Sequence, residues 1–269
     1  MIKLEIADLI IQVNIPIKVL HDNMYAFLYK GSKEADIFWD VEFGERFNIG
    51  DVPFIKNNEV VICKTNEKTI FKYNKDVGVP FVVIAKDEFK DCTFYVTKNY
   101  EHYDKYNKNM EKQMKDGLYK VFKDMFIYAC VYNNRLPIES SSVTYDDKAY
   151  LFSSKKGMGK TTQAKLWKKE LDCELLNDSF VVAFVEDEDN KIVKVYGCPW
   201  SDVSETNLRK IIDFGGIAFI TRSKGNVIYE LDKEDVGLRL LDNLNVTFID
   251  KGIVDNVTVL INRLCRCIK

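Results

Sequence analysis

The first hundred residues carry their apolar side chains in short runs rather than at helical spacing. These runs are rich in β-branched and aromatic residues, and Gly, Asn and Asp separate them. Segments of this composition favour short strands joined as antiparallel hairpins. The pattern predicts strands at 2–13, 26–29, 37–43, 59–63, 69–73, 81–85 and 92–96. No group of catalytic side chains occurs in this region, which leaves two roles open: recognising a substrate, or packing against the rest of the chain.

The hydrophobic period changes after a polar connector at 97–110. Apolar residues then recur every three or four positions, which predicts an amphipathic helix from Met110 to Tyr132. Gly117 weakens this helix locally because glycine loses the most backbone freedom on folding. The apolar stripe consists of Met114, Leu118, Val121, Phe122, Met125, Phe126 and Ala129. A stripe of this kind is typical of core packing.

Beyond Pro137, strand-like runs and turns dominate the pattern. A strand at 140–145, a turn at 146–147 and a strand at 148–152 form one hairpin. No long crossover helix follows residue 172, so the sheet is expected to be mixed and partly antiparallel. Further expected elements are a helix at 160–171, strands at 174–178, 180–185, 191–196, 217–220 and 227–231, and helices at 233–244 and 256–267. The expected class is α+β or α/β, with a β-rich N-terminal region at 1–108 and a second domain at 109–269.

Composition narrows the function classes. The 269 residues are 46% hydrophobic, which suits one large domain or two modest ones. The formal net charge is -2 and the sequence pI is about 5.9, so no global basic field exists to attract nucleic acid. Lysine-rich stretches at 105–115, 155–169 and 251–269 are expected to be solvated faces. The composition therefore argues against a nucleic-acid partner.

The N-terminus and the cysteines bear on compartment and metal content. Charged residues stand among the first eight, where a signal peptide would be apolar, and no run reaches the roughly 18 apolar residues of a membrane span. A cytoplasmic protein without a membrane partner is expected. Seven cysteines without framework spacing, with only His21 and His102 as histidines, argue against disulfide staples and a zinc site.

The segment with the most specific chemistry is the run from Ser153 to Thr162. It reads Ser-Ser-Lys-Lys-Gly-Met-Gly-Lys-Thr-Thr and lies between a strand-like and a helix-like run, which is the order that a phosphate-binding loop requires. Backbone N–H groups of such a loop surround a polyphosphate. The residues expected to bind ATP are Ser154, Gly157, Met158, Gly159, Lys160, Thr161 and Thr162. The alternative reading is a lysine-rich surface turn.

Two side chains of this loop have distinct expected roles. Lys160 would reach the β- and γ-phosphates, and the Thr161 hydroxyl would bind Mg²⁺. Ser154 departs from the Gly-x-x-x-x-Gly-Lys-[Ser/Thr] pattern because it replaces the first glycine, and its Cβ restricts the backbone there.

Phosphoryl transfer also needs a carboxylate near the metal or the attacking hydroxyl. Asp178 ends an apolar strand directly after the loop helix, which makes it the candidate acid. It would either hold Mg²⁺ or accept a proton from the acceptor hydroxyl. The alternative reading is a simple Asn-Asp turn. Lys160 and Asp178 are the expected catalytic residues, and Thr161 and Asp178 the expected metal ligands.

Four motifs occur in order: the loop at 151–162, Leu166-Trp167, Leu176-Asn177-Asp178 and the run Tyr-Gly-Cys-Pro-Trp-Ser at 196–201. Together they resemble the HPr kinase-like proteins, whose nucleotide core is related to phosphoenolpyruvate carboxykinase. The resemblance covers about 135–231. It implies a P-loop (Walker A) core with a partly antiparallel sheet, and transfer of phosphate from ATP to a hydroxyl, typically a serine of a protein or peptide. Some relatives belong to peptide-modification pathways.

Three positions depart from the family pattern. Ser179 replaces the second acid after Asn-Asp, Cys198 replaces a threonine, and the family's histidine on the strand before the loop corresponds to about Ser140. Loss of a positioned base typically slows transfer about 10²–10⁴-fold. A second hypothesis is therefore a weak or inactive nucleotide-binding accessory protein of a modification complex. A carboxykinase reaction ranks third because its additional metal ligands are missing.

The remaining expectations concern the acceptor side and partners. Trp200 and Ser201 are candidates for the acceptor side, with a buried tryptophan beneath a turn as the equal alternative. Arg209 and Arg222 are either charge-neutralising residues or ordinary surface arginines. The acceptor is expected to be a serine or threonine hydroxyl of a peptide or small protein, or a small molecule. A homo-oligomer through the 118–132 helix is also considered.

Overall fold

A computed structural model describes residues 1–44, 53–56, 59–73, 81–97, 108–201, 207–225, 227–244 and 246–268. The chain divides into two compact units, Met1–Ala129 and Cys130–Lys269. Each unit is described by itself. The division falls near the end of the long helix α2 (Lys108–Tyr132), whereas the expected boundary between 108 and 109 coincides with the first residues of this helix.

The first unit is built on an eight-stranded mixed sheet with the order β1-β2-β3-β8-β7-β6-β5-β4. The central pairs β2–β3 and β3–β8 are parallel, and the other neighbours pair antiparallel, as the hairpin pattern predicted for most of them. The strands are β1 (Ile2–Ile6), β2 (Leu9–Val13), β3 (Ile37–Gly44), β4 (Ile55–Lys56), β5 (Val60–Lys64), β6 (Thr69–Tyr73), β7 (Phe81–Lys86) and β8 (Asp91–Thr97).

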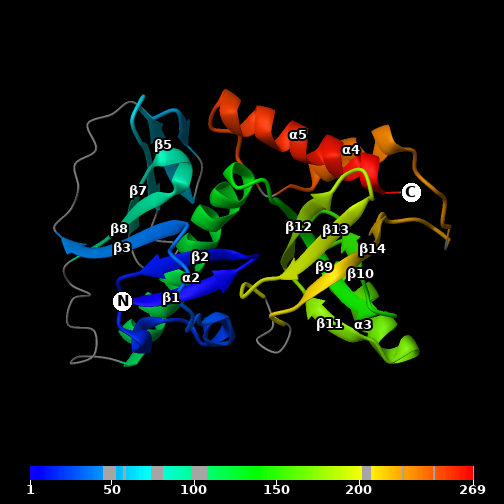
Figure 1. The fold of residues 1–269 in the computed structure, drawn as a ribbon, viewed down its shortest axis with the longest axis horizontal. Helices are drawn as coiled ribbons and strands as arrows, with labels where there is room; N and C mark the ends of the chain where they lie inside the picture. Colours follow the sequence, from blue (N-terminus) through cyan, green and yellow to red (C-terminus); the bar gives the residue numbers. More distant parts are fainter. Residues whose placement is uncertain are drawn as a thin grey trace. The chain divides into compact units, whose positions relative to one another are not determined.

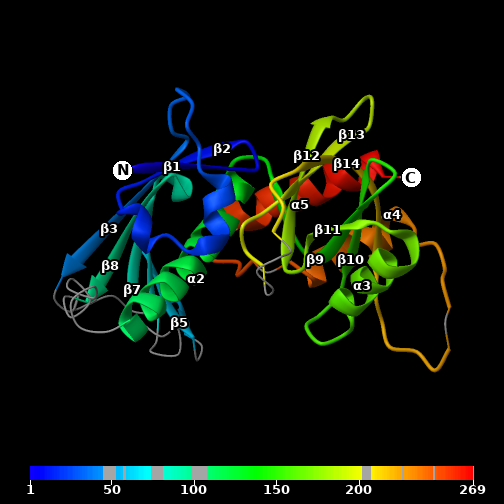
Figure 2. The same ribbon diagram turned by 90° about the horizontal axis from the view of Figure 1, so that it is seen from below.

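Helix α2 runs across one face of this sheet in both views (Figures 1 and 2). Its predicted apolar stripe is buried throughout. The Phe122 ring stacks on Trp39 with centroids 4.6 Å apart and meets Phe94 edge-on at 4.8 Å. One turn and a half further on, Tyr128 stacks on Phe89 at 4.5 Å. The stripe therefore serves core packing, because aromatic pairs of this geometry stabilise helix–sheet contacts.

One strand prediction in the first unit is wrong, and the structure gives another run in finer detail. The expected strand at 26–29 is instead the end of a short 3-10 helix, η2 (Asp22–Phe27), which His21 begins by accepting a hydrogen bond at Nδ1 from the amide of Asn23. Four residues are too few to show a period, so propensity alone misassigned them. The partly alternating run at 2–13 is the antiparallel hairpin β1–β2, and Ala7 and Asp8 form its turn with positive φ angles.

The second unit is built on a six-stranded mixed sheet whose pairings close into a ring, β9-β10-β14-β13-β12 and back to β9, with β11 beside β9. Only β10–β14 is parallel. The α+β class with two mixed sheets is thus confirmed. The strands are β9 (Leu136–Tyr145), β10 (Lys148–Ser153), β11 (Glu174–Asn177), β12 (Phe180–Asp187), β13 (Ile192–Gly197) and β14 (Ile211–Phe219).

Helices cover these strands, some directly and one through another helix (Figures 1 and 2). Helix α3 (Lys160–Leu171) packs on β9, β10 and β11, where Ala164 joins a cluster with Val143 and Phe152. Helix α5 (Lys251–Cys267) packs on β12, β13 and β9, and α4 (Lys233–Asp242) packs on α5. The helix predicted at 256–267 is therefore longer at its start, because Asp250 caps the amide of Ile253 at 2.8 Å.

Three strand predictions in this unit need correction. The expected strand at 227–231 is absent: residues 227–230 pair with no strand, and Ile228 is fully exposed. The strand predicted at 217–220 is the end of β14, which begins at Ile211 because the sheet accommodates Gly215 and Gly216 inside it. Strand β9 begins at Leu136 and includes Pro137.

Candidate functional site

The predicted loop lies between the end of β10 and the start of α3, as the sequence suggested. Gly157 and Gly159 have φ angles of 81° and 105°, a region that side chains with a Cβ rarely adopt. A Cβ built on either glycine would meet no atom within 4 Å, so the space beside the loop is open. Gly159 is the N-cap of α3 and provides no side-chain cap. The first N–H groups of this helix are therefore available to an anion.

The first glycine of the usual pattern is replaced here without backbone strain. Ser154 is buried at 5% exposure and does not lie in the positive-φ region. Its hydroxyl donates to the carbonyl of Lys155 at 3.3 Å, and the amide of Met158 donates to the same carbonyl. The loop therefore closes locally with serine at this position.

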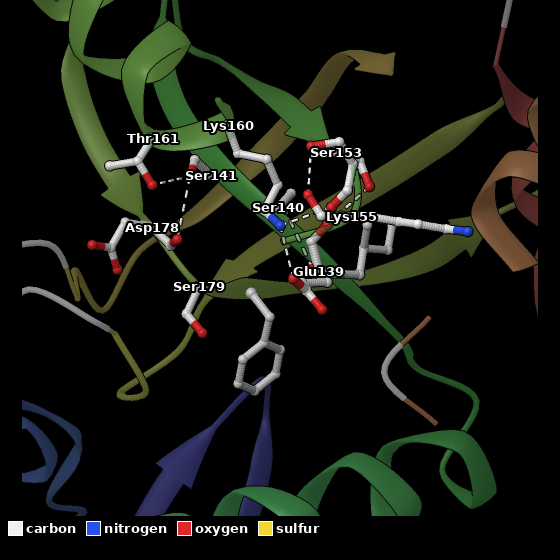
Figure 3. Close-up of polar contacts among 12 residues, drawn as sticks. Glu139, Ser140, Ser141, Ser153, Lys155, Lys160, Thr161, Asp178 and Ser179 are labelled. Atoms are coloured by element: carbon white, nitrogen blue, oxygen red, sulfur yellow. Dashed lines mark hydrogen bonds and ion pairs between the residues drawn. The ribbon is translucent and has the colours of Figure 1, made fainter. Parts of the chain in front are cut away.

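Lys160 does not point freely into solvent. Its ammonium donates to Oε1 of Glu139 and to the carbonyl oxygen of Ser154, each at 2.7 Å. The lysine side chain is 10% exposed and that of Glu139 is 31% exposed. Figure 3 shows the two side chains pointing toward one another from α3 and β9. Glu139 was not among the predicted site residues.

The structure brings Thr161 and Asp178 to the same place through one shared hydroxyl. Ser141 Oγ lies 3.1 Å from Thr161 Oγ1 and donates to the backbone carbonyl of Asp178 at 3.2 Å (Figure 3). The Asp178 carboxylate accepts a hydrogen bond from Ser201 Oγ at 2.7 Å, and the residue is 4% exposed. Lys160 is thus paired with the Glu139 carboxylate, whereas Thr161 is linked through Ser141 to the backbone of Asp178.

The position of Asp178 follows from an interruption in the sheet. Strands β11 and β12 pair in turn with the two halves of β9, and the ladder breaks at Asp178 and Ser179. Asn177 holds this break, since its Oδ1 accepts from the amides of Ser179 and Phe180. Its Nδ2 donates to the carbonyl of Cys198 at 2.8 Å. The Asn-Asp segment is therefore a buried, fixed turn beside the loop.

The Gly-Cys-Pro-Trp-Ser run packs against this turn. A Cβ on Gly197 would lie 1.9 Å from the carbonyl oxygen of Leu208, so only glycine fits there. Trp200 is 1% exposed and stacks on Phe180 with centroids 5.7 Å apart. The tryptophan is thus buried beneath the turn, and of this run it is Ser201 that contacts Asp178.

The two arginines differ in their relation to the loop. Strand β14 is parallel to β10, and the amide of Ile220 continues the pairing with the carbonyl of Ser153. This places the exposed Arg222 beside the loop, where Nη2 donates to the carbonyl of Gly157 at 3.4 Å. Arg209 is also exposed and lies in the segment between β13 and β14.

Two residues of the site, Glu139 and Ser141, were missed by the sequence reasoning. The sequence signal for them is an acid followed by three serines within a predicted strand. In the structure, Ser140, Ser141 and Ser142 each have 0% exposure. Buried hydroxyls are rarely left without a partner, so three in succession indicate a polar network. Here they bond to Ile138, Thr161, Asp178 and Asn177.

Groups that would suggest a different chemistry are absent from the described residues. No cluster of three or more His, Cys, Asp or Glu side chains that would hold a metal ion occurs among them. All seven cysteines lie among the described residues, are buried and form no disulfide, and burial raises the pKa of the Cys130 thiol. His21 stacks on Tyr119, and burial lowers its pKa. His102 lies outside the described residues.

No family model, no curated protein and no solved structure matches this chain. In the part of the chain that the structure describes, no helix has both the length and the apolar character needed to cross a membrane.

Proposed function

We propose that this chain binds ATP with Mg²⁺ and transfers the γ-phosphoryl group to a hydroxyl. The observation that carries the proposal is the convergence of Lys160, Thr161 and Asp178 at the open loop that begins α3. A surface turn that merely reads Gly-Lys-Thr would not need its threonine to be linked, through the buried Ser141, to the backbone of a residue that carries a buried carboxylate. This argument favours the phosphate-loop reading over the surface-turn reading.

The residues present suit a nucleotide and its metal ion. The open space beside Gly157 and Gly159 suits phosphates, and the uncapped N-terminus of α3 favours their negative charge. Thr161 and Asp178 are the residues that would hold Mg²⁺, which typically takes one or two protein ligands and completes its shell with phosphate and water. When bound, the ion neutralises charge on the transferring group.

The class of acceptor rests on the resemblance to HPr kinase-like proteins. That resemblance implies a serine or threonine hydroxyl of a peptide or small protein, with a small-molecule hydroxyl as a variant. Ser201 offers a physical parallel, because its hydroxyl donates to the Asp178 carboxylate as an acceptor hydroxyl would. The β-rich first unit is the candidate for holding such a partner, in a cytoplasmic modification system.

The first test is a titration with ATP and Mg²⁺ followed by thermal unfolding. A ligand bound to the folded state raises stability by RT ln(1 + [L]/Kd), about 2.7 kcal/mol at a hundredfold excess over Kd. Lys160→Ala should abolish the shift, and Asp178→Asn should remove its dependence on Mg²⁺. Lys156→Ala is the matched control, because this lysine is an exposed loop residue. The absence of a shift in the unmodified protein would refute the phosphate-loop assignment.

A second candidate function is a nucleotide-binding accessory protein that does not transfer phosphate. Two observations favour it: Ser179 stands where a second acid is expected, and Ser201 already occupies one oxygen of the buried Asp178 carboxylate. The two functions separate on whether ³²P leaves γ-labelled ATP for a library of serine- and threonine-containing peptides. Binding without transfer to any peptide, and without ADP formation, would support the accessory role.

A further inference from the structure

The ion pair between Glu139 and Lys160 joins two residues that the proposed function uses differently. Lys160 Nζ lies 2.7 Å from Glu139 Oε1, and its other partner is the carbonyl oxygen of Ser154. Among the described residues, no further side chain pairs with the Glu139 carboxylate. The lysine that would bind phosphate is therefore held by a carboxylate of its own chain.

The backbone fixes this carboxylate in place. In the β9–β10 pairing, Ser140 lies opposite Ser153, so Glu139 stands level with the start of the loop. Ser153 Oγ donates to the carbonyl of Glu139 at 2.9 Å, and β12 pairs with Glu139 through Phe180. Both charged side chains are mostly shielded, at 10% and 31% exposure. An ion pair that is shielded in this way is screened less by salt than a surface pair.

Phosphate and Glu139 would compete for the same ammonium group. A lysine at this position of a phosphate loop reaches the β- and γ-phosphates. We propose that Glu139 competes with the nucleotide for Lys160: its carboxylate is the counter-ion of Lys160 in the nucleotide-free protein, and the polyphosphate of ATP replaces it on binding. This inference rests on the proposed ATP site, and it adds Glu139 as a residue that sets the affinity of that site for ATP.

The geometry predicts whether removal of the Glu139 carboxylate strengthens or weakens nucleotide binding. Loss of the carboxylate would leave Lys160 with its hydrogen bond to Ser154, so the lysine would stay near the loop. It would also remove a negative charge that repels phosphate at close range. Removing the competitor should therefore strengthen nucleotide binding, whereas a residue that only held Lys160 in place would weaken it when removed.

The test is isothermal titration of the full chain with Mg²⁺–ATP. Glu139→Gln keeps the shape of the side chain and should lower Kd about tenfold, the order expected for a shielded pair between the surface and buried limits. Glu139→Ala should act in the same direction. Glu170→Gln is the matched control, because it removes an exposed acid three turns away on α3 and should change Kd less than twofold.

A double-mutant cycle separates the ion pair from general repulsion. In Lys160→Met, titrated to millimolar nucleotide, Glu139→Gln should improve binding only about twofold because the competition is gone. An unchanged or higher Kd in Glu139→Gln, or an equal gain in both backgrounds, would overturn the inference. Failure of Lys160→Met to weaken binding would instead overturn the proposed function, so the two failures are distinguishable.

Discussion

At the scale of single residues, buried polar groups near the loop decide what the site contains. Ser141 and Asp178 are both less than 5% exposed, and each is fully engaged through backbone or hydroxyl contacts. Unpaired polar groups in such positions are costly, so their partners are structural requirements. Asp178 was predicted because it ends a strand, but its partners Ser141 and Ser201 come from segments far apart in the sequence.

Gly197 is a residue whose lack of a side chain the packing requires. Gly197→Ala should destabilise the second unit by about 3 kcal/mol, because the new Cβ would clash with the backbone oxygen of Leu208 at 1.9 Å. Gly216→Ala is the control, since its Cβ would make only ordinary contact with Tyr150 at 3.6 Å. Urea unfolding of both variants measures the difference. Equal stability would show that the backbone at Leu208 can move.

A second residue-scale feature lies in the first unit, at Asp124 on α2. Its carboxylate accepts a hydrogen bond from the Tyr73 hydroxyl at 2.9 Å. Burial raises the pKa of Asp124 to about 6, and burial beside this carboxylate raises the pKa of Tyr73 well above its usual value. The folded state therefore binds a proton at Asp124 more tightly than the unfolded chain does.

This pKa shift predicts a pH-dependent stability. Between the ordinary value of 3.8 and about 6, the folded state holds the extra proton, so stability falls as pH rises through this window and is level above it. The loss should be about 1–2 kcal/mol after allowance for partial exposure. Asp124→Asn cannot ionise and should gain stability relative to the unmodified protein at pH 7.5 but not at pH 4.

The measurement is the free energy of unfolding in urea at the two pH values. Glu67→Gln is the control, because Glu67 is an exposed acid of the same unit. If the free energies of unfolding of Asp124→Asn and of the unmodified protein differ by the same amount at both pH values, protonation of Asp124 does not cause the pH dependence.

At the scale of elements, most strands and helices follow from local pattern, and the errors have identifiable causes. The apolar run at 227–231 has the composition of a strand, yet no strand pairs with residues 227–230. A strand requires a neighbour, and sequence pattern does not supply one. Conversely, β14 continues through Gly215 and Gly216 although glycine has a low strand propensity. The neighbouring strand β10 pairs with this part of β14 and supplies the hydrogen bonds that keep it extended.

The start of α5 offers a test of an element boundary that was predicted too late. Asp250→Ala should destabilise the second unit by about 1 kcal/mol, since it removes the acceptor for the amide of Ile253. Asp250→Asn keeps an oxygen in the same position and should retain most of the stability. Thermal unfolding, with circular dichroism at 222 nm, compares the two. Equal losses would assign the effect to charge rather than to capping.

At the scale of the whole molecule, the residues proposed for the ATP site all belong to Cys130–Lys269. The first unit contains a separate sheet with its own aromatic core under α2. Bound nucleotide should therefore act first on the strands and the helix that surround the loop, which are β9, β10, β11 and α3.

Hydrogen exchange followed by mass spectrometry tests this expectation. Saturating Mg²⁺–ATP should slow exchange at least severalfold in peptides covering 136–178, because ligand binding lowers the population of open states. Peptides covering 2–13 and 81–97 should change less than twofold, and Lys160→Ala should remove the protection. Equal protection in both units would contradict a site confined to the second one.

The sequence by itself determined the features that depend on local order. These are the strand–loop–helix around Lys160 and the amphipathic stripe of α2, because a few neighbouring residues set backbone conformation and hydrophobic period. The tertiary structure decided which distant side chains meet. The β9–β10 register and the packing of α3 on β9 bring Glu139 to Lys160 and Ser141 to Thr161, and the antiparallel β12–β13 pairing brings Ser201 to Asp178. Such contacts join side chains 20 to 23 residues apart in the sequence, which local patterns do not encode.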